Sequence, residues 1–197
     1  MVVLLGRRPH GSSRRRHAGG SPDHGGPAVM TWELVVSRRM VPQCGGVLDV
    51  RSVRTQVREW VVARALPVDL DVVDLAVSEL VTNAVRYTAS GLVGGGVDVS
   101  VHTVHAWESG AASALRVDIT DDGGTDRYPV LPCKEDAFED ADLCSESGRG
   151  LGMVVMMTDR AGAVRVWEGE LCRWRVWFEV PVSADVPDSH ESSGWSR

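Results

Sequence analysis

The chain has 197 residues, of which 21 are Lys or Arg, 27 are Asp or Glu and 43% are hydrophobic. This size suits one compact domain and excludes a large multidomain enzyme, and the apolar content excludes disorder along the whole chain. The net charge of −6 combines a basic segment, residues 1–29, with an acidic body, which argues against a dedicated nucleic-acid binder because phosphates require clustered cations.

The two ends of the chain are predicted to lie outside the folded domain, which we place at residues 30–182. Residues 1–29 are rich in Gly, Ser, Pro, Arg and His without an apolar period, which is typical of a disordered tail. Their apolar residues precede their arginines, the reverse of a secretory signal, so we expect a cytoplasmic protein. Met30 is a candidate physiological start, and the alternative is a basic tail that touches acidic surfaces. Residues 183–197 are polar and are predicted to be a second disordered tail.

The first half of the domain is predicted to contain one strand and two helices. Residues 32–36 have the composition of a short strand, and apolar residues at helical spacing predict a helix over about 47–66. A second helix is expected to start near Asp69 or Asp71, because either carboxylate can cap its free N–H groups. It is predicted to run to about residue 88.

The second half is predicted to contain four strands and one helix. Alternation of polar and apolar residues predicts strands over 97–102 and 115–120. Residues 121–147 lack periodicity, which indicates a functional lid or a disordered segment. A short helix and two closing strands are expected over 151–159, 163–167 and 174–180. Short turns favour antiparallel pairing, so the predicted fold is α+β: a two-layer sandwich with a mixed, mostly antiparallel sheet and helices on one face.

The spacing of apolar residues and cysteines excludes two further classes of protein. No apolar run reaches the roughly 18 residues that a membrane-spanning helix needs, so no membrane partner is expected. The four cysteines form no CxxC pair, which favours free thiols and argues against a zinc site.

The first candidate site lies within the second predicted helix, in the segment SELVTNAV. Glu79 and Asn83 are four residues apart and share one helix face, which Arg86 extends. A carboxylate and a carboxamide can hold Mg²⁺, because this ion keeps several waters and takes few protein ligands. A solvated polar stripe is the alternative interpretation.

Two glycine-containing segments form the other candidate sites. The sequence DDGG at 121–124 directly follows a strand, where glycine permits close approach and a carboxylate can accept a hydrogen bond from an amine such as that of adenine. A plain turn is the alternative. The sequence SGRGLGM at 147–153 leads into a helix, whose N–H groups and positive end suit a phosphate; a flexible loop is the alternative. It matches neither the Walker pattern nor the dinucleotide fingerprint.

These three segments, in this order, resemble the GHKL ATPase superfamily that gyrase and histidine kinases share. The likeness is greatest to the anti-sigma-factor serine/threonine kinases and their actinomycete relatives, and it covers roughly residues 32–181. SELVTNAV is similar to the N box of that family, DDGG to its first glycine box and GRGLGM to its second. The resemblance implies the Bergerat ATP-binding fold, with ATP held between the helix layer and a lid.

The resemblance also implies a role for each matched residue. Glu79 corresponds to the general base, Asn83 to the Mg²⁺ ligand and Asp121 to the carboxylate that binds the adenine amine. The implied nucleotide-binding positions are Asn83, Asp121, Gly123, Gly148, Arg149, Gly150, Leu151 and Gly152. Catalysis in such a site consists mostly of positioning and of charge neutralisation by the metal.

The chain departs from the family pattern in three places. Thr125 stands where the first glycine box usually has a second glycine, and Gly124 is expected to take over part of that role. Tyr87 and Ala89 stand where close relatives more often have His and a different small residue. The predicted lid carries many acidic residues, which we interpret as a solvated surface. These departures are expected to affect catalytic turnover more than the binding of ATP.

The function implied by the resemblance is that of an ATP–Mg²⁺-binding transcription regulator. Such a protein binds a sigma factor or similar partner and phosphorylates a serine on a small antagonist protein. One alternative is a module that holds ATP without transferring phosphate, and another is a detached histidine-kinase catalytic domain. Against the latter, no phosphoacceptor helix precedes the domain, and His102 and His105 are expected to make ordinary sheet contacts. A homodimer through the first strand and helix is a further expectation.

Overall fold

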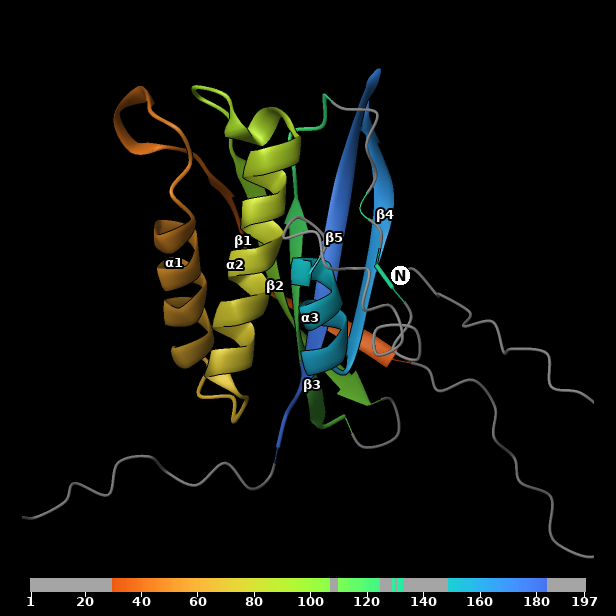
Figure 1. Cartoon of the computed structure of the whole chain (residues 1–197). Coiled ribbons are helices and arrows are strands. Elements are labelled where there is room, and N and C mark those ends of the chain that lie inside the picture. The colour runs from red at the N-terminus through yellow and green to blue at the C-terminus, as the bar shows by residue number, and fades with distance from the viewer. Residues whose placement is uncertain (1–29, 107–109, 125–128, 130, 133–148, 184–197) are drawn as a thin grey trace, which may run out of the picture.

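The computed structural model describes residues 30–106, 110–124, 129, 131–132 and 149–183. These residues form a five-stranded sheet with three α-helices on one of its faces, which confirms the predicted α+β two-layer arrangement (Figure 1). Within the described part of the chain, no helix is long and apolar enough to cross a membrane. The predicted tail over 1–29 and most of the predicted lid lie outside the described residues.

The strands are antiparallel at every pairing, in the order β1-β2-β3-β5-β4. Their bounds are β1 Met30–Met40, β2 Val97–Ala106, β3 Ala112–Thr120, β4 Arg160–Glu168 and β5 Leu171–Pro181. The helices are α1 Val50–Val62, α2 Leu70–Tyr87 and α3 Arg149–Met157, with short 3₁₀ turns η1 Gln43–Gly45 and η2 Ala89–Gly91. The strand β1 extends beyond the predicted 32–36 because both of its ends pair with β2.

Aspartate caps decide where the first two helices begin. The side chain of Asp49 accepts hydrogen bonds from two backbone N–H groups of the first turn of α1, so the predicted start at Val47 is wrong by three residues. Asp69 caps α2 in the same way and leaves Asp71 inside the first turn. A carboxylate at this position satisfies N–H groups that the helix itself cannot pair.

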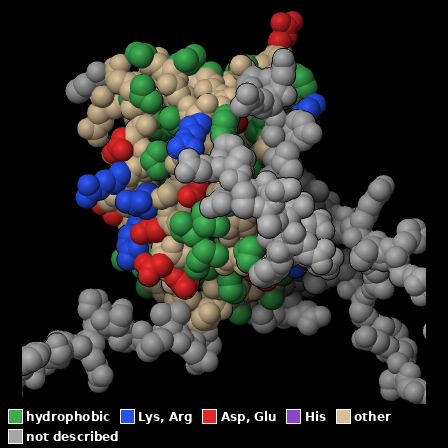
Figure 2. All heavy atoms as spheres, in the orientation of Figure 1, with side chains coloured by type: hydrophobic (Ala, Val, Ile, Leu, Met, Phe, Trp, Pro, Cys, Tyr) green, Lys and Arg blue, Asp and Glu red, His purple; other side chains and the backbone are tan. Residues whose placement is uncertain are grey.

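The core lies between the helix layer and the inner face of the sheet. Valines at intervals of four residues line the buried stripes of α1 and α2, as expected for amphipathic helices. Alternate residues of β2, β3 and β5 face them. The fully buried set includes Val53, Val57, Val61, Val73, Val77, Val81, Val97, Val99, Val101, Leu115 and Phe178. On the solvent side of the two helices, basic and acidic side chains are interspersed (Figure 2), and Arg58 joins α1 to Asp74 of α2 at 2.6 Å.

The other face of the sheet carries a network of charges rather than a second apolar layer. Arg116 on β3 pairs with Asp118 at 3.0 Å and with Glu179 at 3.3 Å, and its guanidinium lies 3.9 Å from the ring centroid of Trp177. His102 lies 3.3 Å from the carboxylate of Asp118, so it makes a sheet contact as predicted. Burial lowers the pKa of His102, because the network leaves little water to solvate an imidazolium.

Candidate functional site

The helix α2 carries the first pair of predicted site residues. Glu79 and Asn83 are half-buried and lie one turn apart, whereas Leu80, Val81 and Ala84 of the same segment are buried in the core. The four-residue spacing therefore places both polar side chains together along the edge of the buried stripe. From there, α2 continues to Tyr87, and η2 follows directly.

The first turn of α3 meets α2 at Glu79. A Cβ atom added to Gly150 would overlap Oε2 of Glu79 and would lie 3.0 Å from its Cδ, so the glutamate side chain can keep its position only beside a glycine. The carboxylate thus lies against the N-terminal end of α3, where the partial positive charge of the helix favours an anion. The N box and the second glycine box, far apart in sequence, are adjacent at this point.

Asp121 lies buried where β3 ends, 7% exposed. Its Oδ1 accepts hydrogen bonds from the backbone N–H of Gly123 at 2.8 Å and of Trp174 at 3.0 Å. Among the described residues, no donor reaches its Oδ2, so one carboxylate oxygen is held in place and the other is left to accept from a ligand. Burial raises the pKa of Asp121, and the two backbone bonds and the charge of Arg173 partly oppose that rise.

The glycines after Asp121 allow the chain to turn tightly between α2 and β5. Gly123 and Gly124 both have positive φ, at 63° and 77°. A Cβ atom on Gly123 would overlap the carbonyl oxygen of Cys172, so the backbones of the two segments are in direct contact. The carbonyl of Gly123 accepts the backbone N–H of Ala89 at 2.8 Å, which fixes the turn to η2 at the end of α2.

Asp122, which the sequence analysis assigned no role, braces this turn. Its carboxylate pairs with Arg39 of β1 at 2.7 Å and accepts the backbone N–H of Gly96 at 2.7 Å. Its backbone N–H donates to the hydroxyl of Ser90 at 2.9 Å. Burial alone would raise the pKa of Asp122, but the bond from Arg39, the bond from Gly96 and the nearby arginine charges outweigh it and lower the pKa.

Arg173 of β5, which no sequence motif indicated, also supports this turn. We call Arg39, Asp122 and Arg173 together the brace. Its Nε donates to the backbone carbonyl of Asp121 at 2.6 Å, and its Nη1 donates to Glu168 at 2.9 Å. Its Nη2 bonds to Asp98 of β2. No local motif could have identified Arg39, Asp98 or Arg173, because their common position results from the order of the strands.

The remaining predicted positions are placed as follows. Arg149 begins α3, and Leu151 is half-buried and packs against the core. A Cβ atom added to Gly152 would lie 3.9 Å from Cγ of Pro132, which is an ordinary van der Waals contact. Gly148 lies outside the described residues.

The residues at which the chain departs from the family pattern lie near the turn at 121–124. Tyr87 is the last residue of α2, and Ala89 donates the hydrogen bond that ties η2 to Gly123. Gly124 has the positive φ that a glycine box requires, which is compatible with the role expected of it. Thr125 and the acidic residues of the predicted lid lie outside the described residues.

The few side-chain oxygens of this site suit a metal ion whose other ligands are phosphates and water. Within the described ranges, no group of three or more His, Cys, Asp or Glu side chains is placed to hold a metal ion. Mg²⁺ commonly binds through one or two protein oxygens together with substrate phosphates and water. Glu79, which lies against Gly150, and Asn83, one turn further along α2, are both half-buried and fit such a partial coordination shell.

Comparison with known families places the three motifs within one matched domain. A family model described as the histidine kinase-like ATPase domain matches residues 47–172, which contain all three motifs. No curated protein matches the chain. The matched range begins just before α1 and ends within β5, so it includes α2, the turn after β3 and α3.

Proposed function

Because this chain belongs to the family of histidine kinase-like ATPase domains and is a GHKL-type ATP-binding domain, we propose that it is an ATP-dependent regulatory kinase. It binds a sigma factor or similar protein partner and phosphorylates a serine on a small antagonist protein in the cytoplasm. The observation that carries the proposal is the contact between the Glu79 carboxylate and Gly150, which brings a candidate base to the N-terminal end of α3, where we place the phosphates.

The order of groups along α2 supports an extended nucleotide. The turn that holds Asp121 is tied to Ala89, just beyond the C-terminal end of α2, whereas Glu79 lies about 12 Å earlier along the helix axis, at about 1.5 Å per residue. In the proposed complex, the adenine amine binds Oδ2 of Asp121 at one end. The phosphates bind the backbone N–H groups of Gly150, Leu151 and Gly152 at the other end.

Each residue then has a physical task. Asn83, between the two ends, would hold Mg²⁺ through its side-chain oxygen. Bound Mg²⁺–ATP supplies the transferable phosphoryl group and neutralises charge on it. Glu79 orients the attacking serine hydroxyl and accepts its proton. Gly150 leaves room for the carboxylate, and the brace of Arg39 and Arg173 holds Asp121 so that the adenine site is formed before the ligand arrives.

The test is phosphoryl transfer from labelled ATP with Mg²⁺ and a candidate antagonist protein. Transfer is expected with the native chain and is expected to be lost in Glu79→Gln, while Glu59→Gln, at an exposed glutamate of α1, serves as the matched control. Intact transfer in Glu79→Gln would remove this residue from the role of base. Tight ATP binding by the native chain without any transfer would instead indicate a non-catalytic binding module.

The nucleotide site itself is tested by calorimetric binding. Asn83→Ala is expected to abolish the dependence of ATP affinity on Mg²⁺, and Asp121→Ala is expected to weaken ATP binding with or without the metal. If both variants bind ATP as the native chain does, the assignment of the site is wrong.

A further inference from the structure

The strand β4 is an exposed edge of the sheet, at the opposite side from β1 (Figure 1). Among the described residues, no strand pairs with its outer edge. Its nine residues pair with β5 without a register shift, and they include no proline and no lysine. Bulges, prolines and charged side chains, lysine above all, are the usual means of preventing an edge from pairing with another strand. The charges of β4 are Arg160 and Glu168 at its ends and Arg165 next to its centre. β4 is therefore long and regular, and no described strand occupies its outer edge.

The sequence of β4, RAGAVRVWE, is complementary to itself when reversed. An antiparallel pair of β4 strands centred on Val164 places Arg160 of each copy opposite Glu168 of the other. The same register places Ala161 opposite Trp167. Side chains that face each other across antiparallel strands lie on the same side of the sheet and touch. Opposite charges thus meet at both ends of the pair, and the largest side chain meets one of the smallest. Within its own chain, Arg160 also lies 3.9 Å from Asp159, and Glu168 lies 2.9 Å from Arg173, so the charges at each end are shared with these partners.

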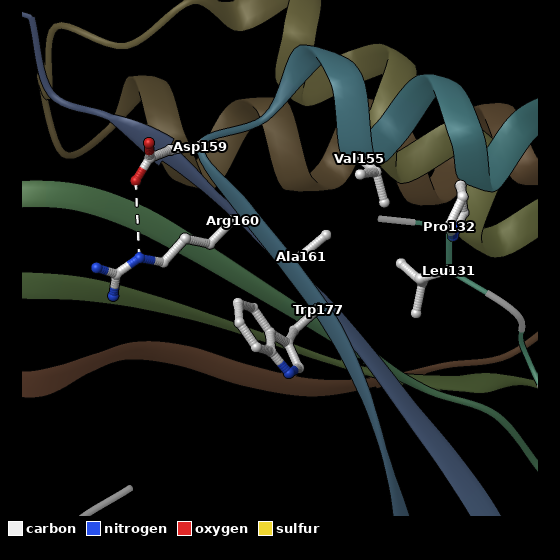
Figure 3. Close-up of a pocket in the computed structure, with 7 residues that line it drawn as sticks. All are labelled: Leu131, Pro132, Val155, Asp159, Arg160, Ala161 and Trp177. Carbon is white, nitrogen blue, oxygen red and sulfur yellow. Dashed lines mark ion pairs between the residues drawn. The ribbon is translucent and has the colours of Figure 1, made fainter. Parts of the chain in front are cut away.

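A cavity of about 460 Å³ lies beside Ala161, at the start of β4 (Figure 3). Its apolar walls include Leu131, Pro132 and Val155. Trp167 is 63% exposed, which is unusual for a tryptophan, and it lies on the same face of β4 as Ala161 because the two are separated by an even number of residues. In the self-paired register, the exposed indole of each copy lies opposite Ala161 of the other, the residue beside which the cavity opens.

We propose that two copies of this chain associate edge to edge through β4, in the antiparallel register centred on Val164, with Trp167 of each copy docked in the cavity beside Ala161 of the other. Both halves of each contact lie on the same surface, which is the condition for a closed two-fold interface and identifies a second copy as the occupant. Trp167 supplies the anchoring contact, since buried aromatic side chains dominate interface energies. Exposed ion pairs contribute little affinity, so the role of the terminal ion pairs is to select the register.

This interface differs from the one expected from the first strand and helix, and the experiment separates them. The mass of the full chain is measured by sedimentation at several concentrations. A dimer is expected, and Val164→Arg is expected to raise its dissociation constant at least about tenfold, because two arginines then meet at the two-fold axis. Val164 is 44% exposed, so the variant keeps its fold.

Two matched variants complete that measurement. Val93→Arg, at a valine that is 77% exposed before β2, and Leu34→Arg, at a leucine that is 55% exposed on β1, are both expected to leave the dimer intact. A native chain that is monomeric at every concentration, a Val164→Arg variant that still dimerises, or a Leu34→Arg variant that dissociates would each overturn the proposal.

The register has its own test. Arg160→Glu and Glu168→Arg each place like charges opposite each other and are expected to weaken the dimer, whereas the double variant restores opposite charges and is expected to recover it. Val164→Cys is expected to form a disulfide-linked dimer under mild oxidation, because directly paired strand residues have Cα atoms within the range that a disulfide spans. A double variant weaker than both single variants, or a Val164→Cys variant that links no better than Val93→Cys, would refute the register.

Discussion

Replacing Gly150 with alanine is expected to displace the Glu79 carboxylate while leaving the fold intact. The added Cβ would overlap Oε2 of Glu79 and would lie 3.0 Å from Cδ, but these atoms are the far end of a flexible side chain. Glu79 can rotate away, at a cost of about 0.5–1.5 kcal/mol if it leaves its preferred rotamer. Alanine offsets this by up to about 1 kcal/mol, because it is a better helix former than glycine.

Gly152→Ala is the matched control, since it makes the same chemical change one half-turn later in α3. Its Cβ would lie 3.9 Å from Pro132, an ordinary contact, so only the gain in helix propensity remains. Its free energy of unfolding is expected to rise by up to about 1 kcal/mol. For a chain of this length, that corresponds to an increase in Tm of about 2–4 °C. Gly150→Ala is expected to stay within about 1 kcal/mol of the native chain.

The assay combines urea unfolding with the rate of phosphoryl transfer. Displacing a base by about 1 Å can reduce a rate on the order of 10²-fold, so Gly150→Ala is expected to lose far more activity than Gly152→Ala at similar stability. Equal rates for the two variants would refute the claim that Gly150 makes room for a working Glu79. A loss of several kcal/mol of stability in Gly150→Ala would show that a rigid contact, and not the glutamate side chain, occupies the space.

Three further variants or conditions test the surroundings of the site. Gly123→Ala is expected to destabilise the fold by more than about 1 kcal/mol, because φ is 63° and the Cβ would overlap the carbonyl of Cys172. A smaller loss of unfolding free energy in urea would contradict the close approach of Gly123 to Cys172. ATP affinity measured by calorimetry is expected to fall on acidification at a pH above the ordinary aspartate value of 3.8, because burial raises the pKa of Asp121 and protonation removes the acceptor; a fall that follows 3.8 would argue against this role. The free energy of unfolding is expected to decrease as the pH drops below 6.5, because burial lowers the pKa of His102 in the folded chain and the unfolded chain then binds more protons. His102→Gln should flatten this dependence, and an unchanged slope would assign it to other groups.

Local features of the chain could be predicted from sequence because they depend on neighbouring residues. The spacing of Glu79 and Asn83 on one helix face follows from the helical period, and the turn at 121–124 follows from its glycines. Apolar spacing alone predicts a start of α1 near Val47, but the cap at Asp49 delays the helix to Val50. The length of β1 was underestimated because its ends are ordered by pairing with β2, which the strand itself does not reveal.

By itself, the sequence determined the α+β class, the order of the elements and the three motifs that bear the chemistry, since each follows from local periodicity or from turn and cap residues. Only the tertiary structure decided that β5, rather than β4, lies beside β3, because strand order depends on the packing of the whole sheet. That order brings Arg173 and Trp174 to Asp121, and the packing of α3 on α2 brings Gly150 to Glu79. It also leaves β4 as a free edge within the described residues. Contacts between segments distant in sequence leave no periodic signal, so neither the brace around Asp121 nor the self-complementary edge could be located before the fold was known.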